Sequence, residues 1–320
     1  MTLGGWLLLA LLAGGAVPTA AGVRQSLPAA PARASFDFNR GWRLAVGDPP
    51  GAETPAFADD AWKPVTLPHA FNEDDAFRKD IRDLPTGIVW YRKRFRLPAG
   101  SRGKKVVLEF EGIRHGGEFY VNGKSVGRHE NGVMAFGLDI TGALLPPPQE
   151  NVIAARIDNS WNYKETATGS GYQWSDRNFY ANYGGINKNV RLHVMDRLYQ
   201  TLPLYSNLGT TGVYVHATNF DVPGGGATVT AESQVRNEYD EPRTFRYDVS
   251  IVDAAGKTVR TFGGKEERIG PNETRTVSAN ARVTGLRFWS WGYGCLYDVR
   301  TTLTVNGRPA DAVTTRTGFR

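Results

Sequence analysis

The stretch that decides the fold runs from Lys104 to Thr141 and reads KKVVLEFEGIRHGGEFYVNGKSVGRHENGVMAFGLDIT. Its first part alternates between two sets of residues, Val106, Leu108 and Phe110 on one side and Val107, Glu109 and Glu111 on the other. This period of two is typical of a half-buried β-strand. A second strand is predicted by a further alternation, in which Phe119 and Val121 alternate with Glu118 and Tyr120.

A tight turn follows the second strand at Asn122-Gly123, and Val126 begins the return strand. Asn-Gly supplies the two positive-φ positions of a type I′ turn, which matches the twist of a hairpin. A long loop then closes on Asp139. The stretch therefore predicts a β-hairpin around which the first part of the chain is built.

Length and composition place this hairpin in a larger all-β chain. The 320 residues correspond to about two domains, and 41% hydrophobic residues are enough to bury a sizeable core. Glycine is frequent, and long apolar helical runs are absent after residue 35.

The formal net charge of +6 indicates a solvated basic surface. Because no basic stripe or nucleic-acid module is present, we expect no nucleic-acid partner.

Residue types that bind metals or cofactors give no pattern here. The single cysteine, Cys295, allows neither an intramolecular disulfide nor a thiolate cluster, and its aromatic neighbours favour a buried small side chain. The five histidines lack metal-ligand spacing. Phosphate-binding loops and dinucleotide fingerprints are also absent. We therefore expect no metal and no cofactor.

The N-terminus resembles an export signal over residues 1–22. Trp6–Ala13 (WLLLALLA) is an apolar run of signal-core length, too short to span a bilayer, and small residues follow it. The start, MTLGG, lacks the usual positive charge, so a membrane anchor or a mispredicted start stays open. Residues 23–35 are predicted to be a disordered leader. We expect a secreted or periplasmic protein with no membrane contact after signal removal.

Several motifs in the first half occur in a fixed order. The first set consists of W-x-x-V-x-L-P-H from Trp62 to His69, Asn72, and Trp90-Tyr91-Arg92 with Phe95. The second set consists of Phe110-Glu111-Gly112, Tyr120–Gly123, Val126-Gly127, Phe136–Thr141, and the segment Tyr183–Val194. This ordered set resembles the N-terminal sugar-binding domain of family 2 glycoside hydrolases, the β-galactosidase and β-glucuronidase group. The chain departs from the family pattern at Phe71, where tryptophan is usual, and at Asn187-Lys188, where Tyr-Arg is usual.

The resemblance implies a jelly-roll β-sandwich over residues 36–198, which many short strands with Gly/Pro turns also favour. A linker over residues 199–207 is predicted next. About seven short strands over residues 208–320 indicate an immunoglobulin-like β-sandwich. Family 2 enzymes place such a domain second, so the domain order agrees. The predicted fold class is therefore all-β, a jelly roll followed by an immunoglobulin-like sandwich.

The family carries its two catalytic glutamates in a third domain, a (β/α)₈ barrel, which needs roughly 250 further residues. The segment Ala312–Arg320 resembles the lead into that barrel, so we expect this chain to lack it. Three Asn-Glu pairs, ending at Glu73, Glu238 and Glu273, match the residue types of the family's acid/base motif. All three fall in predicted loops, where we expect solvated side chains. No catalytic residue is therefore predicted.

Two loops are the predicted substrate contacts. The loop Asn159–Asn182 is long, polar and rich in aromatic residues, as functional loops often are. The resemblance implies that this loop and the one after Leu67-Pro68-His69 help to hold the terminal sugar. The substrate-binding residues predicted by position are Asn72, Asp74, Trp174, Asp176 and Asn178. The alternative is that the aromatics only pack the loop onto its own sheet or a domain interface. A third segment, Gly285–Tyr297, resembles a family motif but lacks its prolines, and we expect it to be structural.

Three functions remain open from the sequence. The first is the N-terminal portion of a secreted β-galactosidase-like enzyme that acts on terminal β-glycosides and needs a barrel domain as partner. The second is a stand-alone secreted carbohydrate-binding or adhesion protein. The third is a structural interaction module without sugar affinity. Under the first, the chain alone should not hydrolyse glycosides.

Overall fold

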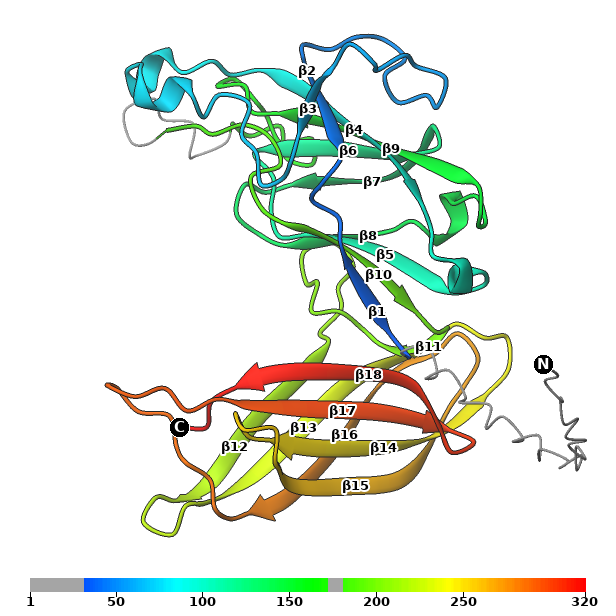
Figure 1. The fold of residues 1–320 in the computed structure, drawn as a ribbon, viewed down its shortest axis with the longest axis vertical. Coiled ribbons are helices and arrows are strands. Elements are labelled where there is room, and N and C mark those ends of the chain that lie inside the picture. The colour runs from blue at the N-terminus through cyan, green and yellow to red at the C-terminus, as the bar shows by residue number, and fades with distance from the viewer. Residues whose placement is uncertain (1–31, 172–180) are drawn as a thin grey trace, which may run out of the picture. The chain divides into compact units, whose positions relative to one another are not determined.

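The computed structural model describes residues 32–171 and 181–320, and these fold into two β-sandwiches (Figure 1). The strands of the first sandwich are β1 (Ala34–Asp37), β2 (Trp42–Val46), β3 (Lys63–Val65), β4 (Ile88–Arg96), β5 (Lys105–Phe110), β6 (Gly116–Val121), β7 (Lys124–Glu130), β8 (Phe136–Asp139), β9 (Glu150–Asp158) and β10 (Val190–Met195). One sheet has the order β1-β10-β5-β8 and the other β3-β2-β4-β9-β6-β7. The predicted all-β fold is confirmed.

The short 3₁₀ turns of the described chain all belong to the first sandwich. They are η1 (Asp75–Phe77), η2 (Ile81–Asp83), η3 (Ala99–Ser101) and η4 (Thr141–Ala143). Within residues 32–171 and 181–320, the structure contains no helix with the length and apolar character needed to cross a bilayer.

The core of the first sandwich is built largely from the stretch that predicts the hairpin. Phe110 of β5, Phe119 of β6 and Phe136 of β8 are fully buried, and their ring centroids lie 4.9 to 5.4 Å apart. Aromatic pairs at such distances add stability beyond the area that they bury. The alternation of Val106, Leu108 and Phe110 therefore points, as predicted, into the core.

The hairpin turn has the predicted geometry. Asn122 has a φ of 52° and Gly123 a φ of 78°, the two positive values that a type I′ turn requires. The side chain of Asn122 also forms hydrogen bonds with residues outside the turn. Its amide nitrogen donates to the Ala143 carbonyl (2.9 Å), and its oxygen accepts from the backbone nitrogen of Val152 (2.9 Å). The turn is thereby tied to β9 and η4.

Strand β5 is more buried than its alternation predicts. Val107, on the face opposite the core, is 3% exposed because Met195, Tyr199 and Leu204 cover it. These residues come from the segment that leads out of the first sandwich. The sequence pattern of β5 could not show this cover, because the covering residues are about 90 positions away along the chain.

The second sandwich consists of two four-stranded sheets. Its strands are β11 (Leu198–Gln200), β12 (Val213–Asp221), β13 (Gly226–Asn237), β14 (Arg243–Val252), β15 (Thr258–Ile269), β16 (Thr274–Val283), β17 (Tyr297–Val305) and β18 (Arg308–Thr317). In one sheet β13 pairs with β11, β12 and β16, and the other has the order β15-β14-β17-β18. The segment predicted to be a linker begins inside β11, which pairs with the end of β13.

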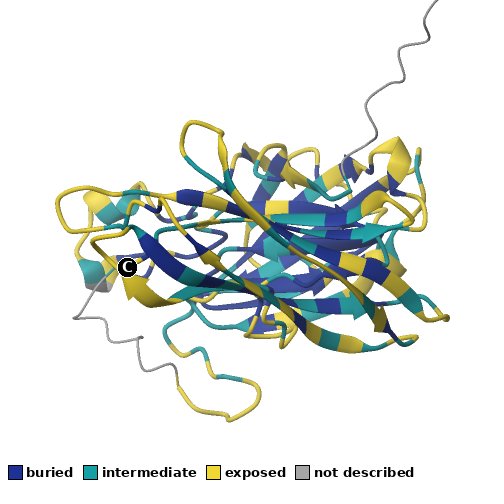
Figure 2. Ribbon diagram, turned by 90° about the horizontal axis from the view of Figure 1, so that it is seen from below, coloured by how far each residue is buried: buried dark blue, intermediate teal, exposed yellow. Residues whose placement is uncertain are grey.

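Buried and exposed residues alternate along these strands, as Figure 2 shows. In β14, Phe245, Tyr247, Val249 and Ile251 face the core, as the sequence pattern predicts. Cys295 is half-buried and forms no disulfide. The second sandwich is therefore held by its apolar core and its backbone ladders.

Candidate functional site

The two loops predicted to contact substrate are joined at their bases by a buried asparagine. Asn72 is 2% exposed, and its amide nitrogen donates to the carbonyls of Pro85 (2.8 Å) and Asn182 (2.9 Å). Its side-chain oxygen accepts from the backbone nitrogen of Gly184 (3.1 Å). Asn72 therefore joins the loop after Leu67-Pro68-His69 to the end of the long loop.

Two further buried asparagines close the long loop at its base. Asn182 donates from its side chain to the Asn159 carbonyl (2.8 Å), and Asn159 donates in return to the Asn182 carbonyl (3.1 Å). The side-chain oxygen of Asn182 also accepts from Arg114 Nε (3.1 Å). Since buried polar groups are costly unless they are hydrogen-bonded, this reciprocal pair fixes the loop ends. Asn72, Asn159 and Asn182 are named the loop-base cluster below.

Close packing around the cluster requires glycine at Gly184. A Cβ atom there would overlap the side chains of Asn159 and Phe71. The neighbouring His69 has a structural role as well, because its Nδ1 lies 3.0 Å from the hydroxyl of Tyr91. Burial lowers the pKa of His69, so its imidazole stays neutral at physiological pH.

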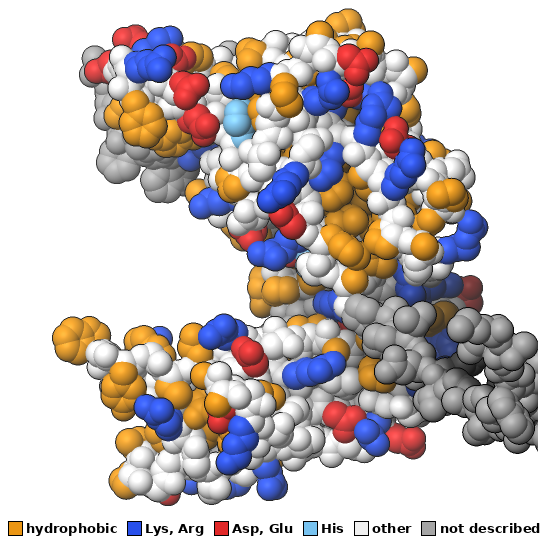
Figure 3. All heavy atoms as spheres, in the orientation of Figure 1, with side chains coloured by type: hydrophobic (Ala, Val, Ile, Leu, Met, Phe, Trp, Pro, Cys, Tyr) orange, Lys and Arg blue, Asp and Glu red, His pale blue; other side chains and the backbone are white. Residues whose placement is uncertain are grey.

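Asp74 lies on the rim of this end of the sandwich. It is exposed and precedes η1, where its side chain makes no capping hydrogen bond. Glu73 beside it is also exposed, and Phe77 of η1 is 88% exposed. Figure 3 shows acidic and basic side chains gathered over the η1–η2 segment, at the upper left. The structure thus brings Asn72 and Asp74 to one end of the sandwich but gives them different surroundings.

The other three predicted substrate contacts, Trp174, Asp176 and Asn178, lie outside the described residues. The described part of the long loop contains two of its aromatics, Trp161 and Tyr163, both half-buried. Tyr163 hydrogen-bonds Glu130 of β7 through its hydroxyl (2.5 Å). Sequence reasoning did not identify Glu130, Arg114 or the Asn159–Asn182 pair, since no local motif marks a polar residue whose partner lies elsewhere in the chain.

The glutamates of the three Asn-Glu pairs occupy different environments. Glu73 is solvated, as expected. Glu238 is not, because its carboxylate bonds Lys105 (2.7 Å) and the Tyr199 hydroxyl (2.9 Å). Glu273 accepts from the backbone nitrogen of Gly270 (2.5 Å). The expectation of solvated side chains is therefore wrong for Glu238, which connects three segments of the chain.

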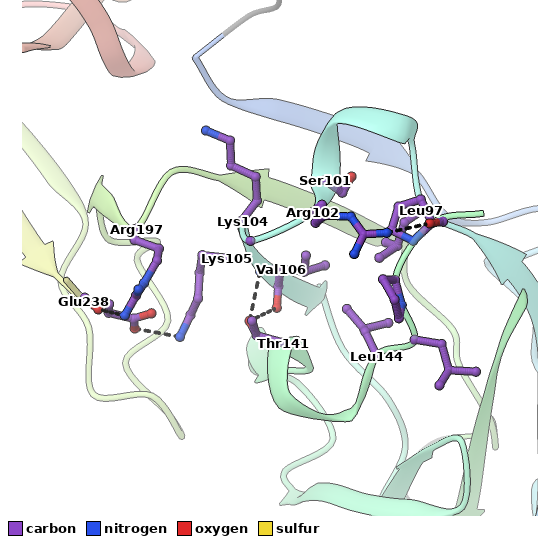
Figure 4. Close-up of a pocket in the computed structure, with 14 residues that line it drawn as sticks. Leu97, Ser101, Arg102, Lys104, Lys105, Val106, Thr141, Leu144, Arg197 and Glu238 are labelled. Carbon is purple, nitrogen blue, oxygen red and sulfur yellow. Dashed lines mark hydrogen bonds and ion pairs between the residues drawn. The ribbon is translucent and has the colours of Figure 1, made fainter. Parts of the chain in front are cut away.

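Glu238 also lines a pocket of about 430 Å³, which Figure 4 shows. Three of its four lysine and arginine residues have close partners, and the fourth, Arg102, is exposed and donates to the Pro147 carbonyl (3.3 Å). Lys105 bonds Asp139 (2.6 Å) as well as Glu238, Lys104 bonds Asp196 (2.7 Å), and Arg197 donates to the Glu238 carbonyl. Because these three cations are paired with groups of the protein itself, we interpret the pocket as a structural contact between segments of the chain and not as a ligand site. It is named the junction below.

The segment Gly285–Tyr297 divides into buried and exposed parts. Leu286 and Tyr297 are buried in the second core, whereas Trp291 is 93% and Tyr293 58% exposed. Ser290 and Tyr293 pair through their backbones, which closes the loop. Hydrophobic side chains gather over this end of the second sandwich in Figure 3. Within the described residues, no group of acidic, histidine or cysteine side chains could hold a metal ion.

Comparison with known proteins gives a match for each of the two sandwiches. Residues 49–195 match the profile of the sugar-binding domain of glycosyl hydrolases family 2, and residues 213–320 match a second profile of the same family. The chain is 32% identical over 297 residues to a β-glucuronidase of Formosa agariphila and 29% identical over 295 residues to a β-galactosidase of Bacteroides ovatus. These alignments cover 90% of this chain but only 30% and 32% of the relatives.

Solved structures give the same result. A β-glucuronidase of glycoside hydrolase family 2 superimposes with a TM-score of 0.83 at 30% identity, over 92% of this chain and 31% of the other. A β-glucuronidase of Bacteroides uniformis superimposes with a TM-score of 0.76 at 27% identity, over 90% of this chain and 32% of the other. The chain therefore spans about a third of the length of the relatives that it matches.

Proposed function

This chain belongs to family 2 of the glycosyl hydrolases, and from that premise we propose that it forms the sugar-binding portion of an enzyme acting on terminal β-glycosides. The observation that carries the proposal is the loop-base cluster. It fixes two loops at one end of a domain that matches the family's sugar-binding profile. A rigid base is what a binding loop needs, because ordering the loop on binding would otherwise cost affinity.

We further propose that Asn72 positions the two loops while Asp74 contacts the sugar. Within the described residues, the Asn72 amide hydrogen-bonds Pro85, Asn182 and Gly184 of the protein itself. Asp74 is exposed on the rim, where a carboxylate can accept hydrogen bonds from sugar hydroxyls. Trp174, Asp176 and Asn178 stay predictions from position in the loop.

Hydrolysis requires a pair of carboxyl groups, about 5–5.5 Å apart in retaining enzymes. We propose that these groups belong to a catalytic domain outside the present 320 residues. The support is that the chain covers only 30–32% of its relatives, and that Glu238 and Glu273 are engaged in structural bonds.

Two measurements on the purified chain test this proposal. Calorimetric titration with methyl β-D-glucuronide and methyl β-D-galactoside should detect binding of at least one, and the preferred one identifies the sugar class. Chromogenic β-glucuronide and β-galactoside should not be hydrolysed above a heat-denatured control. Turnover by the chain alone would contradict the assignment of the catalytic carboxylates to another domain. Failure to bind either glycoside would contradict the sugar-binding role.

We also propose that the protein is exported through residues 1–22, on the basis of the apolar run Trp6–Ala13. N-terminal sequencing of the mature protein from its host would test this. A mature chain that began at Met1 would contradict cleavage of an export signal.

A further inference from the structure

One carboxylate on the hairpin holds the described part of the long loop. Besides a hydrogen bond from Arg128 of its own strand, Glu130, the last residue of β7, accepts three hydrogen bonds from the long loop through its Oε1 atom. They come from the Tyr163 hydroxyl (2.5 Å), the Thr166 backbone nitrogen (2.9 Å) and the Thr166 hydroxyl (3.0 Å). The Glu130 side chain is 15% exposed, and its bond to Tyr163 is partly buried, whereas its two bonds to Thr166 lie at the surface. The loop is thus fixed to a strand about 35 residues earlier in the chain.

The charges around Glu130 keep it in the form that accepts hydrogen bonds. Arg128 Nη2 lies 3.0 Å from its Oε1, and Arg128 Nη1 bonds Glu118 (3.2 Å). Burial by itself would raise the pKa of Glu130, but the hydrogen bonds from Tyr163 and Thr166 outweigh it, and the net pKa is lowered. The carboxylate is therefore ionised at neutral pH. Hydrogen bonds to an ionised acceptor are about twice as strong as neutral ones.

The position of Tyr163 is fixed from a second side. Its ring is stacked on that of His115, with centroids 6.4 Å apart and an interplanar angle of 13°. Its hydroxyl occupies the space above Gly116, where any Cβ atom would overlap it. Tyr163 therefore fits this place only because residue 116 is glycine. The burial of Tyr163 and its bond to Glu130 raise its pKa, so the hydroxyl stays a donor.

The rest of the described loop is a compact turn attached to this point. Glu165 donates from its backbone nitrogen to the Ser170 carbonyl (3.0 Å), and Gly169 donates to the Glu165 carbonyl (2.8 Å). Lys164 and Gly171 form a backbone bridge. Because the turn holds itself together, moving Thr166 away from Glu130 would move residues 164–171 as one unit.

We propose that Glu130 is a positioning residue for carbohydrate binding, which sets the place of loop residues 159–171 through Tyr163 and Thr166. The carbohydrate part of this inference rests on the proposed function of the chain, whereas the attachment of the loop does not. The ligand class is the terminal β-linked hexopyranoside of the proposed enzyme.

The first test measures the attachment without any ligand. Lys164 is exposed and is the single lysine or arginine between residues 159 and 171, so trypsin cleavage after it reports on release of the loop. The variants are Tyr163→Phe, which removes one hydroxyl, and Glu130→Gln, which removes the charge. Tyr120→Phe is the matched control, because it removes a hydroxyl–carboxylate bond of the same hairpin (Tyr120 to Glu118 Oε2, 3.0 Å) and leaves the bond between Arg128 and Glu118 Oε1 in place.

Both loop variants should be cleaved at Lys164 roughly tenfold faster than the wild type, the factor expected for loss of a hydrogen bond to a charged group. Tyr120→Phe should be cleaved at the wild-type rate. Gly116→Ala should reproduce the effect, since its methyl group displaces the Tyr163 hydroxyl without altering Glu130. Wild-type cleavage rates in Tyr163→Phe and Glu130→Gln would overturn the inference.

The second test separates positioning from a purely structural role. Titration of the same folded variants with methyl β-D-glucuronide and methyl β-D-galactoside should show roughly tenfold weaker binding, and the double variant should be no weaker than either single variant. Faster cleavage with unchanged affinity would overturn the positioning role and leave a structural one. If the wild type binds neither glycoside, the proposed function fails, and the cleavage assay still decides whether Glu130 holds the loop.

Discussion

The two ends of the first sandwich use buried polar groups in different ways. At the loop end, neutral asparagines and the Glu130–Tyr163 bond hold backbone segments while Asp74 and Phe77 stay exposed on the rim. At the junction with the second sandwich, charged side chains pair with one another around Lys105. The paired charges hold the junction together, whereas the exposed groups of the loop end agree with the proposal that this end contacts a ligand.

A substitution at the junction should lower the free energy of unfolding more than one at the loop end. Lys105→Met leaves Asp139 and Glu238 without their shared cation. The Asp139 side chain is 44% exposed, so the main cost comes from the more buried pair with Glu238, whose loss from one side costs about 3 kcal/mol. Urea unfolding should show this loss, while glycoside affinity and cleavage at Lys164 stay at wild-type levels. Lys124→Met on the exposed hairpin is the control. An equal loss of affinity would mean that the two ends are not independent.

The loop-base cluster should give a smaller loss of stability, accompanied by a loss of binding. Asn182→Ala removes the acceptor of Arg114 Nε and the donor to the Asn159 carbonyl, both buried, at a cost of about 2 kcal/mol. Glycoside affinity should fall, and trypsin should cleave faster at Lys164. A variant that lost stability but kept full affinity would show that the cluster does not support the binding loops.

The two ends should lose stability at different pH values as the solution is acidified. Burial, with the nearby Arg114 charge, lowers the pKa of His115 from its usual 6.5 to about 4. The unfolded chain then binds a proton that the folded chain does not, so stability falls as the pH drops from about 6.5 to about 4. At the junction, burial would raise the pKa of Asp139, but its bonds to Lys105 and Thr141 lower it overall. The stabilisation from Asp139 is therefore lost only below its usual value of 3.8.

Hydrogen exchange at pH 7 and pH 5, corrected for intrinsic rates, would measure this difference. Amides of β6 and of residues 159–171 should lose protection at pH 5, whereas amides of β5 beside Lys105 should keep theirs. Burial also lowers the pKa of His69 and His129 in the same sandwich, so these histidines add to the acid sensitivity. Equal loss at both ends would contradict its assignment to these three histidines.

The smallest effect on stability should come from the rim. Asp74→Ala removes an exposed side chain that makes no capping bond, so the free energy of unfolding should change by less than about 0.5 kcal/mol. Glycoside affinity should nevertheless fall about tenfold if Asp74 accepts a sugar hydroxyl. Asn72→Ala is the variant to compare with it. Because the Asn72 side chain makes buried hydrogen bonds, its removal should lower the free energy of unfolding by about 2 kcal/mol. Unchanged affinity in Asp74→Ala would remove Asp74 from the binding site.

Much of the fold follows from short-range patterns. The alternation in β5 and β14 predicted which side chains face the cores, and Asn122-Gly123 predicted the turn type. The cover over Val107 and the pairing of Glu238 were not predicted, because both depend on segments distant in the chain. For the candidate site, the sequence pointed to two loops that the structure joins at their bases, but not to the residues that hold them.

The sequence by itself therefore determined the strands, the turns, the order of the two sandwiches and the family, since each depends on neighbouring residues or on ordered motifs. Only the tertiary structure decided that Asn72, Asn159 and Asn182 form one cluster and that Glu130 holds Tyr163. The physical reason is that a buried polar group needs a partner, and the pattern of neighbours cannot name a partner that lies 110 residues away, as Asn182 does from Asn72.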